Sequence, residues 1–170
     1  MNKARLIIAV SGFLFLGRAF AAAPVVQSSS ASSVAASQAA LTDDTLQKML
    51  DAMGYEPKKL SKGYLIAIKR DSWTFNMQLT LSSDMSKLGF NANLGVVSNP
   101  QAVTAAQWMA LLVSNKNIDP SSFYFDDEQK KLYIHRVLDN RGIAPAFLRQ
   151  QIENFCGNMK DTAELWKFTD

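Results

Sequence analysis

The residue types that perform acid–base chemistry or bind metals are sparse in this sequence. It contains one histidine, His135, and one cysteine, Cys156, separated by twenty-one positions. A zinc site needs several Cys, His or carboxylate ligands at workable spacing, so this pair argues against one. The acidic run 126–128 (DDE) lacks the alternating ligands and the glycine of a calcium loop and is typical of a solvated hairpin tip. The sequence therefore predicts no metal and no other cofactor.

His135 is the one candidate general base, and its surroundings do not favour catalysis. A Ser or Cys nucleophile needs such a base within hydrogen-bond reach. The histidine lies in a run with Tyr133 and Val137 on its own side, and the chain has no G-x-S-x-G elbow. Phosphate-binding patterns of the G-x-x-x-x-G-K and G-x-G-x-x-G types are absent as well. We therefore predict that the protein is not an enzyme; a polar cleft around His135 with a nearby carboxylate would reverse this prediction.

The first residues have the pattern of an export signal. A basic start precedes an apolar run of twelve residues, 6–17, and the tripeptide 19–21 (AFA) supplies a small-x-small cleavage pattern. We expect residues 1–21 to be a signal peptide cleaved after Ala21, which would place the mature protein in the periplasm or outside the cell. The apolar run is shorter than the ~20 residues of a membrane span, and no later segment approaches that length, so no span is expected in the mature chain.

The mature chain divides into two segments of different composition. Residues 22–40 contain no charge and no aromatic side chain, which is typical of a flexible Ala/Ser-rich linker. Residues 41–170 have the usual size of one domain, ~100–150 residues. The signal peptide carries Lys3, Arg5 and Arg18, so 15 of the 18 basic residues remain to face 15 acidic ones. A nucleic-acid partner is not predicted, because it would need a basic patch.

Alternating apolar and polar residues predict an antiparallel sheet. Residues 73–81 alternate Trp, Phe, Met and Leu with Thr, Asn and Gln, and 88–96 repeats this period of two after a polar turn. Strands without helices between each pair argue against a parallel sheet. We therefore predict an α+β fold in the order α-β-β-β-α-β-β-α, an antiparallel sheet packed by helices. The strands are expected at 64–68, 73–81, 88–96, 122–125 and 131–137, and the helices at 42–53, from 102 or 104 to 115, and at 144–166.

The second predicted helix is unusually apolar and has no charge before Lys116. It has little surface suited to water, so it is either buried in the middle of the domain or meets a second protein chain on one side. We take Trp108, Leu111 and Leu112 as the candidate partner or dimer surface, because exposed apolar patches mark such sites. This prediction fails if these side chains are fully buried within a monomer. An exposed edge strand offers a second route, by pairing with an extended peptide.

The aromatic residues allow an alternative function. Trp73, Phe90 and Phe155 could line a cavity of about a few hundred Å3 and hold a small apolar ligand, as in a carrier or sensor. A solid core would argue against this alternative. Cys156 has no partner for an intrachain disulfide, so it is either a buried residue beside Phe155 or an intermolecular bridge.

The C-terminal half resembles the YbjN-like family. The resemblance rests on the runs 123–125 (FYF) and 131–140 (KLYIHRVLDN), followed by Gly142–Ile143, Phe147–Leu148 and 152–155 (IENF). That family shares its fold with type III secretion chaperones of the Tir-chaperone kind, to which the run 164–166 (ELW) is similar. The resemblance extends over Leu41 to Trp166 and rests on structural motifs.

The resemblance implies a non-enzymatic domain that binds another polypeptide, often as a homodimer. It supplies no catalytic residues, since neither family has a catalytic set. This sequence differs from both families in having a predicted signal peptide, which argues against a cytoplasmic export-chaperone role. We therefore expect an exported protein-binding module, regulatory or chaperone-like.

Overall fold

The computed structural model of the chain describes residues 39–170. The predicted signal peptide, its cleavage site at Ala21 and most of the predicted linker lie outside these residues. The helices are α1 (Asp43–Ala52), α2 (Ala105–Asn115) and α3 (Pro145–Asp161), with short 3-10 helices η1 (Pro100–Ala102) and η2 (Ala163–Trp166). The strands are β1 (Lys58–Lys59), β2 (Tyr64–Arg70), β3 (Trp73–Leu81), β4 (Lys87–Val96), β5 (Ser121–Asp126) and β6 (Lys131–Asp139).

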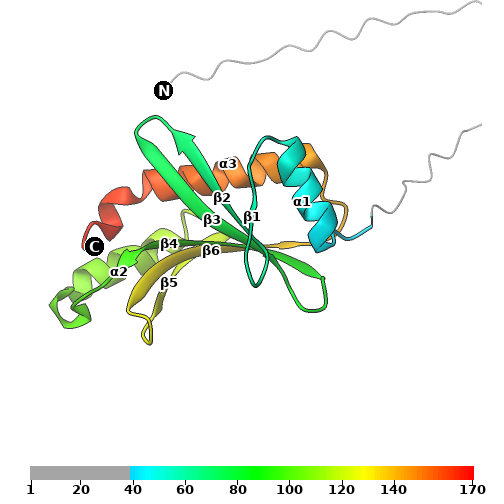
Figure 1. The fold of residues 1–170 in the computed structure, drawn as a ribbon. Helices are drawn as coiled ribbons and strands as arrows, with labels where there is room; N and C mark the ends of the chain where they lie inside the picture. Colours follow the sequence, from blue (N-terminus) through cyan, green and yellow to red (C-terminus); the bar gives the residue numbers. More distant parts are fainter. Residues whose placement is uncertain (1–38) are drawn as a thin grey trace, which may run out of the picture. The chain divides into compact units, whose positions relative to one another are not determined.

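The strands form one antiparallel sheet in the order β1-β2-β3-β4-β6-β5. Figure 1 shows α3 running across one side of this sheet, with α1 beside β1 and α2 near β4, β5 and β6. The predicted α+β class and order of elements are therefore confirmed. The structure adds the two-residue strand β1, which lies in a stretch that the sequence indicates as a polar connection.

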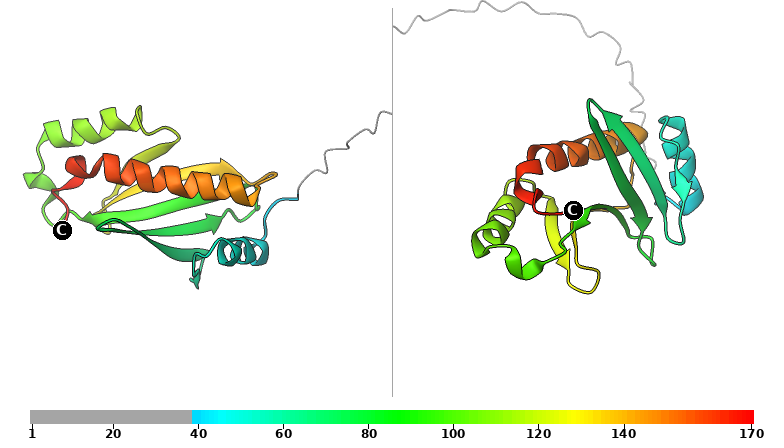
Figure 2. Two further views of the ribbon diagram at one scale, coloured as in Figure 1. Left: turned by 90° about the horizontal axis from the view of Figure 1, so that it is seen from above. Right: turned by 60° about the vertical axis from the view of Figure 1, so that its left-hand side comes forward.

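The two faces of the sheet differ in character. The face toward α3 carries the apolar positions of the period-two pattern, so Leu79 of β3 stands opposite Phe90 of β4, and both are buried. Figure 2, left, shows α3 lying along the strands on this side. On the opposite face, cross-strand pairing places four polar side chains in one row across the strands: Gln78, Asn91, His135 and Ser122. No helix of residues 39–170 buries this row, and we call this side the open face.

Asn140 joins the beginning of the described chain to the sheet. Its side chain is fully buried, accepts a hydrogen bond from the Leu41 N–H at 3.0 Å and donates to the Leu41 carbonyl at 2.8 Å. It also donates to the Met85 carbonyl at 2.8 Å in the turn between β3 and β4. One amide therefore joins three segments that are distant in the sequence: the residues that precede α1, the turn between β3 and β4, and the end of β6.

The helix ends follow local chemistry. Thr42 caps α1 by accepting from the Thr45 N–H at 3.2 Å, and Gly54, with φ at +82°, follows its end. The last helix ends at Asp161 rather than continuing to Trp166 as predicted. The Thr162 hydroxyl donates to the Asn158 carbonyl at 2.6 Å, which competes with the helical backbone pattern, and the separate 3-10 helix η2 follows.

Candidate functional site

Helix α2 is held by its two ends and by one of its sides. Thr104 and Gln107 form a capping box at its start, where the Gln107 N–H donates to the Thr104 hydroxyl at 3.2 Å. The helix has no acidic residue in its first turn and no basic residue in its last. Near its other end, the Asn115 side chain accepts a hydrogen bond from the Phe123 N–H of β5 at 2.7 Å. The capping box fixes where the helix begins, and the bond from Phe123 attaches its last turn to β5.

The inner side of α2 packs against β5 and the C-terminal segment. Leu111 is only 2 % exposed and belongs to the core. Trp108 is half-buried, with its ring 5.2 Å from the Phe125 ring and 5.5 Å from the Phe168 ring, measured between centroids. These two residues, both predicted to lie on a partner surface, therefore hold the helix to its own domain.

The outer side of α2 is apolar and faces solvent. Met109, Leu112 and Val113 are 58 %, 61 % and 60 % exposed, and the exposed alanines Ala105 and Ala106 lie on the same side at helical spacing. We call Met109, Leu112 and Val113 the outer stripe. Of the predicted surface residues, only Leu112 belongs to it fully. Met109 and Val113 belong to the outer stripe, and Leu111 does not. A helical projection drawn with Leu111 and Ser114 on the inner side would have indicated this.

The sheet edges differ in how much free backbone they offer. On β5, the Ser121 N–H donates to the Ile118 carbonyl at 2.8 Å and the Phe123 N–H donates to Asn115, so the edge is partly occupied by its own domain. At the other edge, β1 pairs only with Tyr64 and Leu65 of β2. Within residues 39–170, the rest of β2 has no strand on that side, so β2 is the open edge. The basic residues Lys69 and Arg70 at its end are of the kind that discourages edge-to-edge pairing.

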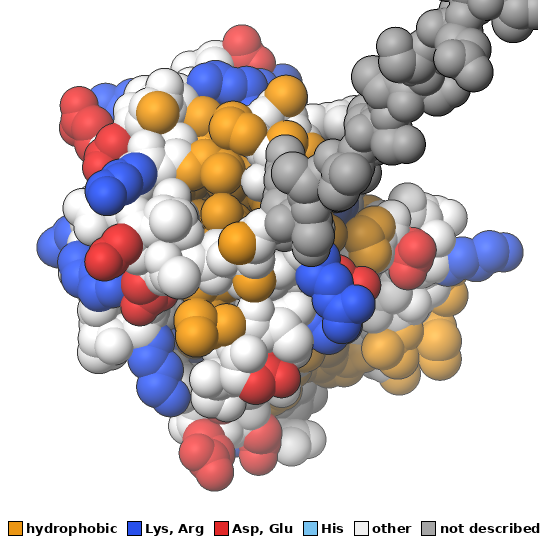
Figure 3. Space-filling model, turned by 90° about the vertical axis from the view of Figure 1, so that its right-hand side faces the viewer, with side chains coloured by type: hydrophobic (Ala, Val, Ile, Leu, Met, Phe, Trp, Pro, Cys, Tyr) orange, Lys and Arg blue, Asp and Glu red, His pale blue; other side chains and the backbone are white. Residues whose placement is uncertain are grey.

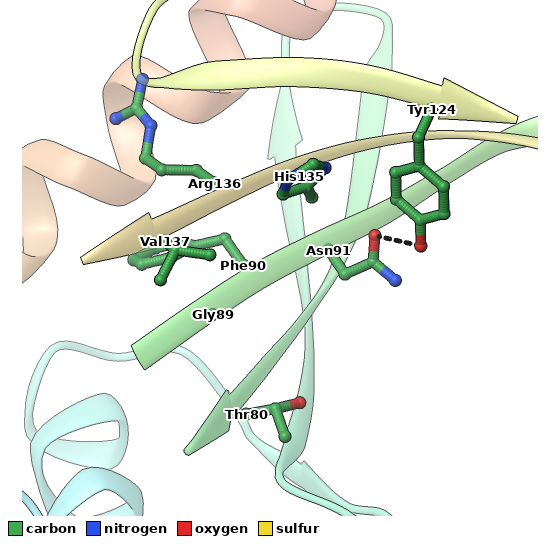
Figure 4. A pocket seen from close by; sticks show the side chains of 8 residues that line it. All are labelled: Thr80, Gly89, Phe90, Asn91, Tyr124, His135, Arg136 and Val137. Carbon is green, nitrogen blue, oxygen red and sulfur yellow. Dashed lines mark hydrogen bonds between the residues drawn. The ribbon is translucent and has the colours of Figure 1, made fainter. Parts of the chain in front are cut away.

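A shallow hollow of about 440 Å3 lies on the open face around His135 (Figure 4). It exists where Gly89 lacks a side chain, between Thr80, Val137 and the ring of Tyr124. His135 Nε2 lies 3.5 Å from the Ser122 hydroxyl oxygen. None of the residues that line the hollow is an acid, so the Ser–His pair has no carboxylate there to orient it. A polar cleft with a carboxylate near His135, which would have indicated an enzyme, is not formed by the residues that line this hollow.

The aromatic side chains proposed for a ligand cavity belong to two packing clusters. Phe90 and Phe155 are fully buried and pack against each other with ring centroids 5.8 Å apart. Trp73 instead stacks on Phe75 at 5.7 Å and meets Trp166 edge-on at 6.2 Å. Because Phe90 and Phe155 already fill the space between sheet and α3, the geometry gives little support to an apolar ligand carrier.

The residue types that bind metals are not grouped in the part of the chain that the structure describes. No group of three His, Cys, Asp or Glu residues within 39–170 is arranged to hold a metal ion. Among the same residues, no helix is long and apolar enough to cross a membrane. On the face drawn in Figure 3, acidic and basic side chains alternate among exposed hydrophobic ones, so this face has no broad field of one sign.

Cys156 is buried, with 1 % exposure, and forms no disulfide. Burial raises the pKa of its thiol to about 11, and the positive charge of Arg70 acts in the opposite direction without offsetting it. The thiol is therefore protonated at neutral pH and shielded from reagents, as expected for a packing residue.

The comparisons with known proteins support the fold. No protein-family model matches the chain, and no curated protein matches it either. Among solved structures, the chain is similar to YbjN, a candidate transcription regulator from Escherichia coli, with 19 % identity over 75 % of this chain and 96 % of YbjN at a TM-score of 0.52. This likeness confirms the YbjN-like fold that the sequence resemblance implied.

Two solved complexes show a similar chain at lower scores. One is the HopA1–SchA chaperone–effector complex, with 11 % identity over 68 % of this chain and 88 % of the matched chain at a TM-score of 0.49. The other is the ExsC–ExsE complex, with 16 % identity over 74 % of this chain and 90 % of the matched chain at a TM-score of 0.48.

Proposed function

We propose that this chain is an exported, non-enzymatic protein-binding module, and that its outer stripe binds a second copy of the same chain. The observation that carries the proposal is the exposure of Met109, Leu112 and Val113, three large aliphatic side chains on one uncharged helix side. Single exposed apolar residues are common, but a contiguous row along a helix marks a contact surface.

The energetic argument favours covering this row. Full burial of an aliphatic side chain is worth about 1.5–3 kcal/mol, so covering the three exposed parts would give about 1–2 kcal/mol for each residue before the costs of association. Trp108 lies beside the stripe and holds α2 to Phe125 and Phe168, so the surface is rigid before a partner arrives.

A second copy fits the outer stripe because the stripe has no charge. In a two-fold dimer the same patch meets itself, so any charge on the patch would face a like charge near the axis. Helix α2 has no acidic or basic residue between Ala105 and Asn115, so the stripe itself brings no charge to the axis, and the exposed Lys116 on the same side lies at the end of the helix, one turn beyond Leu112. A regulatory or chaperone-like role would then depend on what the dimer binds in turn.

Methionine methyl resonances would test this contact within one sample. Met109 lies on the outer stripe, whereas Met85 is 47 % exposed in the turn between β3 and β4 and serves as the matched internal control. In mature protein labelled at the methionine methyls, the Met109 resonance should move as protein concentration rises and the Met85 resonance should not. A Met109→Leu variant assigns the signal. An unchanged Met109 resonance, or equal shifts of both resonances, would contradict the proposed surface.

The export part of the proposal rests on residues 1–21 and is tested separately. The full chain, expressed in a bacterial host, should appear in the periplasmic fraction with the mass of a chain that begins at Ala22. An Ala21→Phe variant places a bulky residue where the cleavage pattern requires a small one, and it should accumulate uncleaved. Recovery of the uncleaved wild-type chain from the cytoplasm would contradict export.

A further inference from the structure

Arg136 is a buried cation whose side chain points away from the open face. It lies on β6 opposite Phe90 of β4 and Ser121 of β5, and its side chain is 3 % exposed. Figure 4 shows it turning from the strand toward α3, on the other side of the sheet from His135 and Val137. The guanidinium carbon lies 6.0 Å from the centre of the Phe155 ring, so one of its faces covers an aromatic side chain.

Neutral groups position this guanidinium. Its Nε donates to the Ser121 hydroxyl at 3.0 Å, and Nη1 donates to the Gln151 side-chain oxygen at 2.8 Å and to the Gln151 carbonyl at 3.4 Å. Asn158 in turn donates to the same Ser121 hydroxyl at 3.1 Å. The Ser121 hydroxyl is therefore held by both Arg136 and Asn158.

Arg136 forms no ion pair with any carboxylate among residues 39–170. None of the ion pairs of this part of the chain includes it, and its Nη2 makes no hydrogen bond there. Burial lowers the pKa of Arg136, while the negative charge of Asp119 acts in the opposite direction from beyond ion-pair distance. A buried charge is costly unless an opposite charge and hydrogen bonds compensate it, so the geometry leaves room for an anionic partner.

Arg136 lines a hollow of about 540 Å3 between β6, α3 and the turn that precedes β5. Polar groups dominate the lining, with the amides of Gln151, Asn154 and Asn158 and the exposed acids Asp119 and Asp161. Glu153 also reaches the hollow, and its carboxylate is ion-paired with Arg70. The hollow therefore has one buried positive charge and two free negative charges in its lining.

We propose that this hollow binds a small molecule that carries both a carboxylate and an ammonium group, such as an amino acid or a short peptide. The carboxylate would meet the free Nη2 of Arg136, since a guanidinium is suited to planar carboxylates. The ammonium group would lie near Asp119 and Asp161. A phosphate dianion fits less well, because the same two acids would repel it. The site lies apart from α2 and does not depend on the proposed dimer.

A titration of the nitrogen-15-labelled mature chain tests the site directly. The Nε–H resonance of Arg136 reports on the guanidinium, and the probes are glycine, diglycine, acetate, methylammonium and inorganic phosphate at constant ionic strength. Glycine or diglycine should move this resonance and bind at least about tenfold more tightly than acetate or methylammonium. Comparison of glycine with diglycine distinguishes a free amino acid from a peptide. Absence of any shift, or equal or tighter binding of acetate or phosphate, would overturn the proposal.

Variants of the lining residues test the positive charge of Arg136 and the negative charges of Asp119 and Asp161 separately. Arg136→Met should abolish binding of glycine and diglycine, with the dispersion of the backbone spectrum as the check on folding. If that variant fails to fold, the double variant Asp119→Asn, Asp161→Asn decides, because both residues are exposed. It should weaken zwitterion binding about tenfold and strengthen acetate binding. Asp127→Asn, in the exposed loop between β5 and β6, is the matched control and should change neither. An unaltered zwitterion affinity in the double variant would overturn the assignment.

Discussion

The side-chain oxygen of Asn115, at the end of α2, accepts a hydrogen bond from the backbone N–H of Phe123 at 2.7 Å. This bond attaches the last turn of α2 to the outer edge of β5. It also occupies a donor that an incoming strand would need, and it turns Leu111 inward and Leu112 outward. The orientation of the outer stripe and the closure of this sheet edge therefore share one contact.

Replacement of Asn115 by Ala should lower the free energy of unfolding by about 1–3 kcal/mol, because the half-buried Phe123 N–H loses its acceptor. Urea unfolding followed by Trp fluorescence would measure the change. Asn117→Ala, at an exposed position just beyond the helix, should change it by less than about 0.5 kcal/mol. Equal effects of the two substitutions would show that the bond does not hold α2.

Asn140→Ala should be more damaging, since the Asn140 amide is fully buried and makes three hydrogen bonds to Leu41 and Met85. We expect a loss of about 3 kcal/mol and faster hydrogen exchange in α1, which Leu41 precedes. Asn76→Ala on the exposed part of β3 is the control for loss of an amide. A loss below about 1 kcal/mol for Asn140→Ala would contradict the role of this amide as a tie between distant segments.

The burial of the Cys156 thiol predicts a low reactivity in the folded protein and a free energy of unfolding that depends on pH. Because burial raises its pKa from 9.0 to about 11, the unfolded chain loses this proton at a lower pH than the folded chain. Stability from this group is complete below pH 9 and declines as the pH rises from 9 toward 11. A thiol reagent at pH 8 should label Cys156 only after urea unfolding, and Cys156→Ala should flatten the decline above pH 9. Rapid labelling of the native protein would contradict the burial.

The sheet could be predicted from the sequence because its signal is local. The alternation in β3 and β4 places Leu79 and Phe90 on the buried face, as the structure has them. The orientation of helix α2 is harder to predict, because both of its sides are apolar and the period of 3.6 residues gives little contrast between Leu111 and Leu112. The contacts of Trp108 with Phe125 and Phe168 and the hydrogen bond from Phe123 to Asn115 decide which side is outer, and none of them is a local pattern of the helix sequence.

The surroundings of Arg136 could not be predicted from local patterns. Its place in β6, two residues after the buried Ile134, puts it on the inward side, but an arginine there looks like an interruption of an apolar pattern. Its partners come from β5 and α3 and are fifteen residues away in either direction. The strand β1 also escaped prediction, because two exposed lysines carry no apolar periodicity.

The measurement that tests the proposed function most directly is the light-scattering mass of the mature chain, residues 22–170, with and without reductant. Our account predicts a dimer that persists in reductant, since Cys156 is buried, and that becomes a monomer in the Leu112→Asp variant. Phe147→Asp, at another exposed apolar residue near the start of α3, is the control and should remain dimeric. A monomeric wild-type chain, or a Leu112→Asp variant that stays dimeric, would contradict binding through the outer stripe.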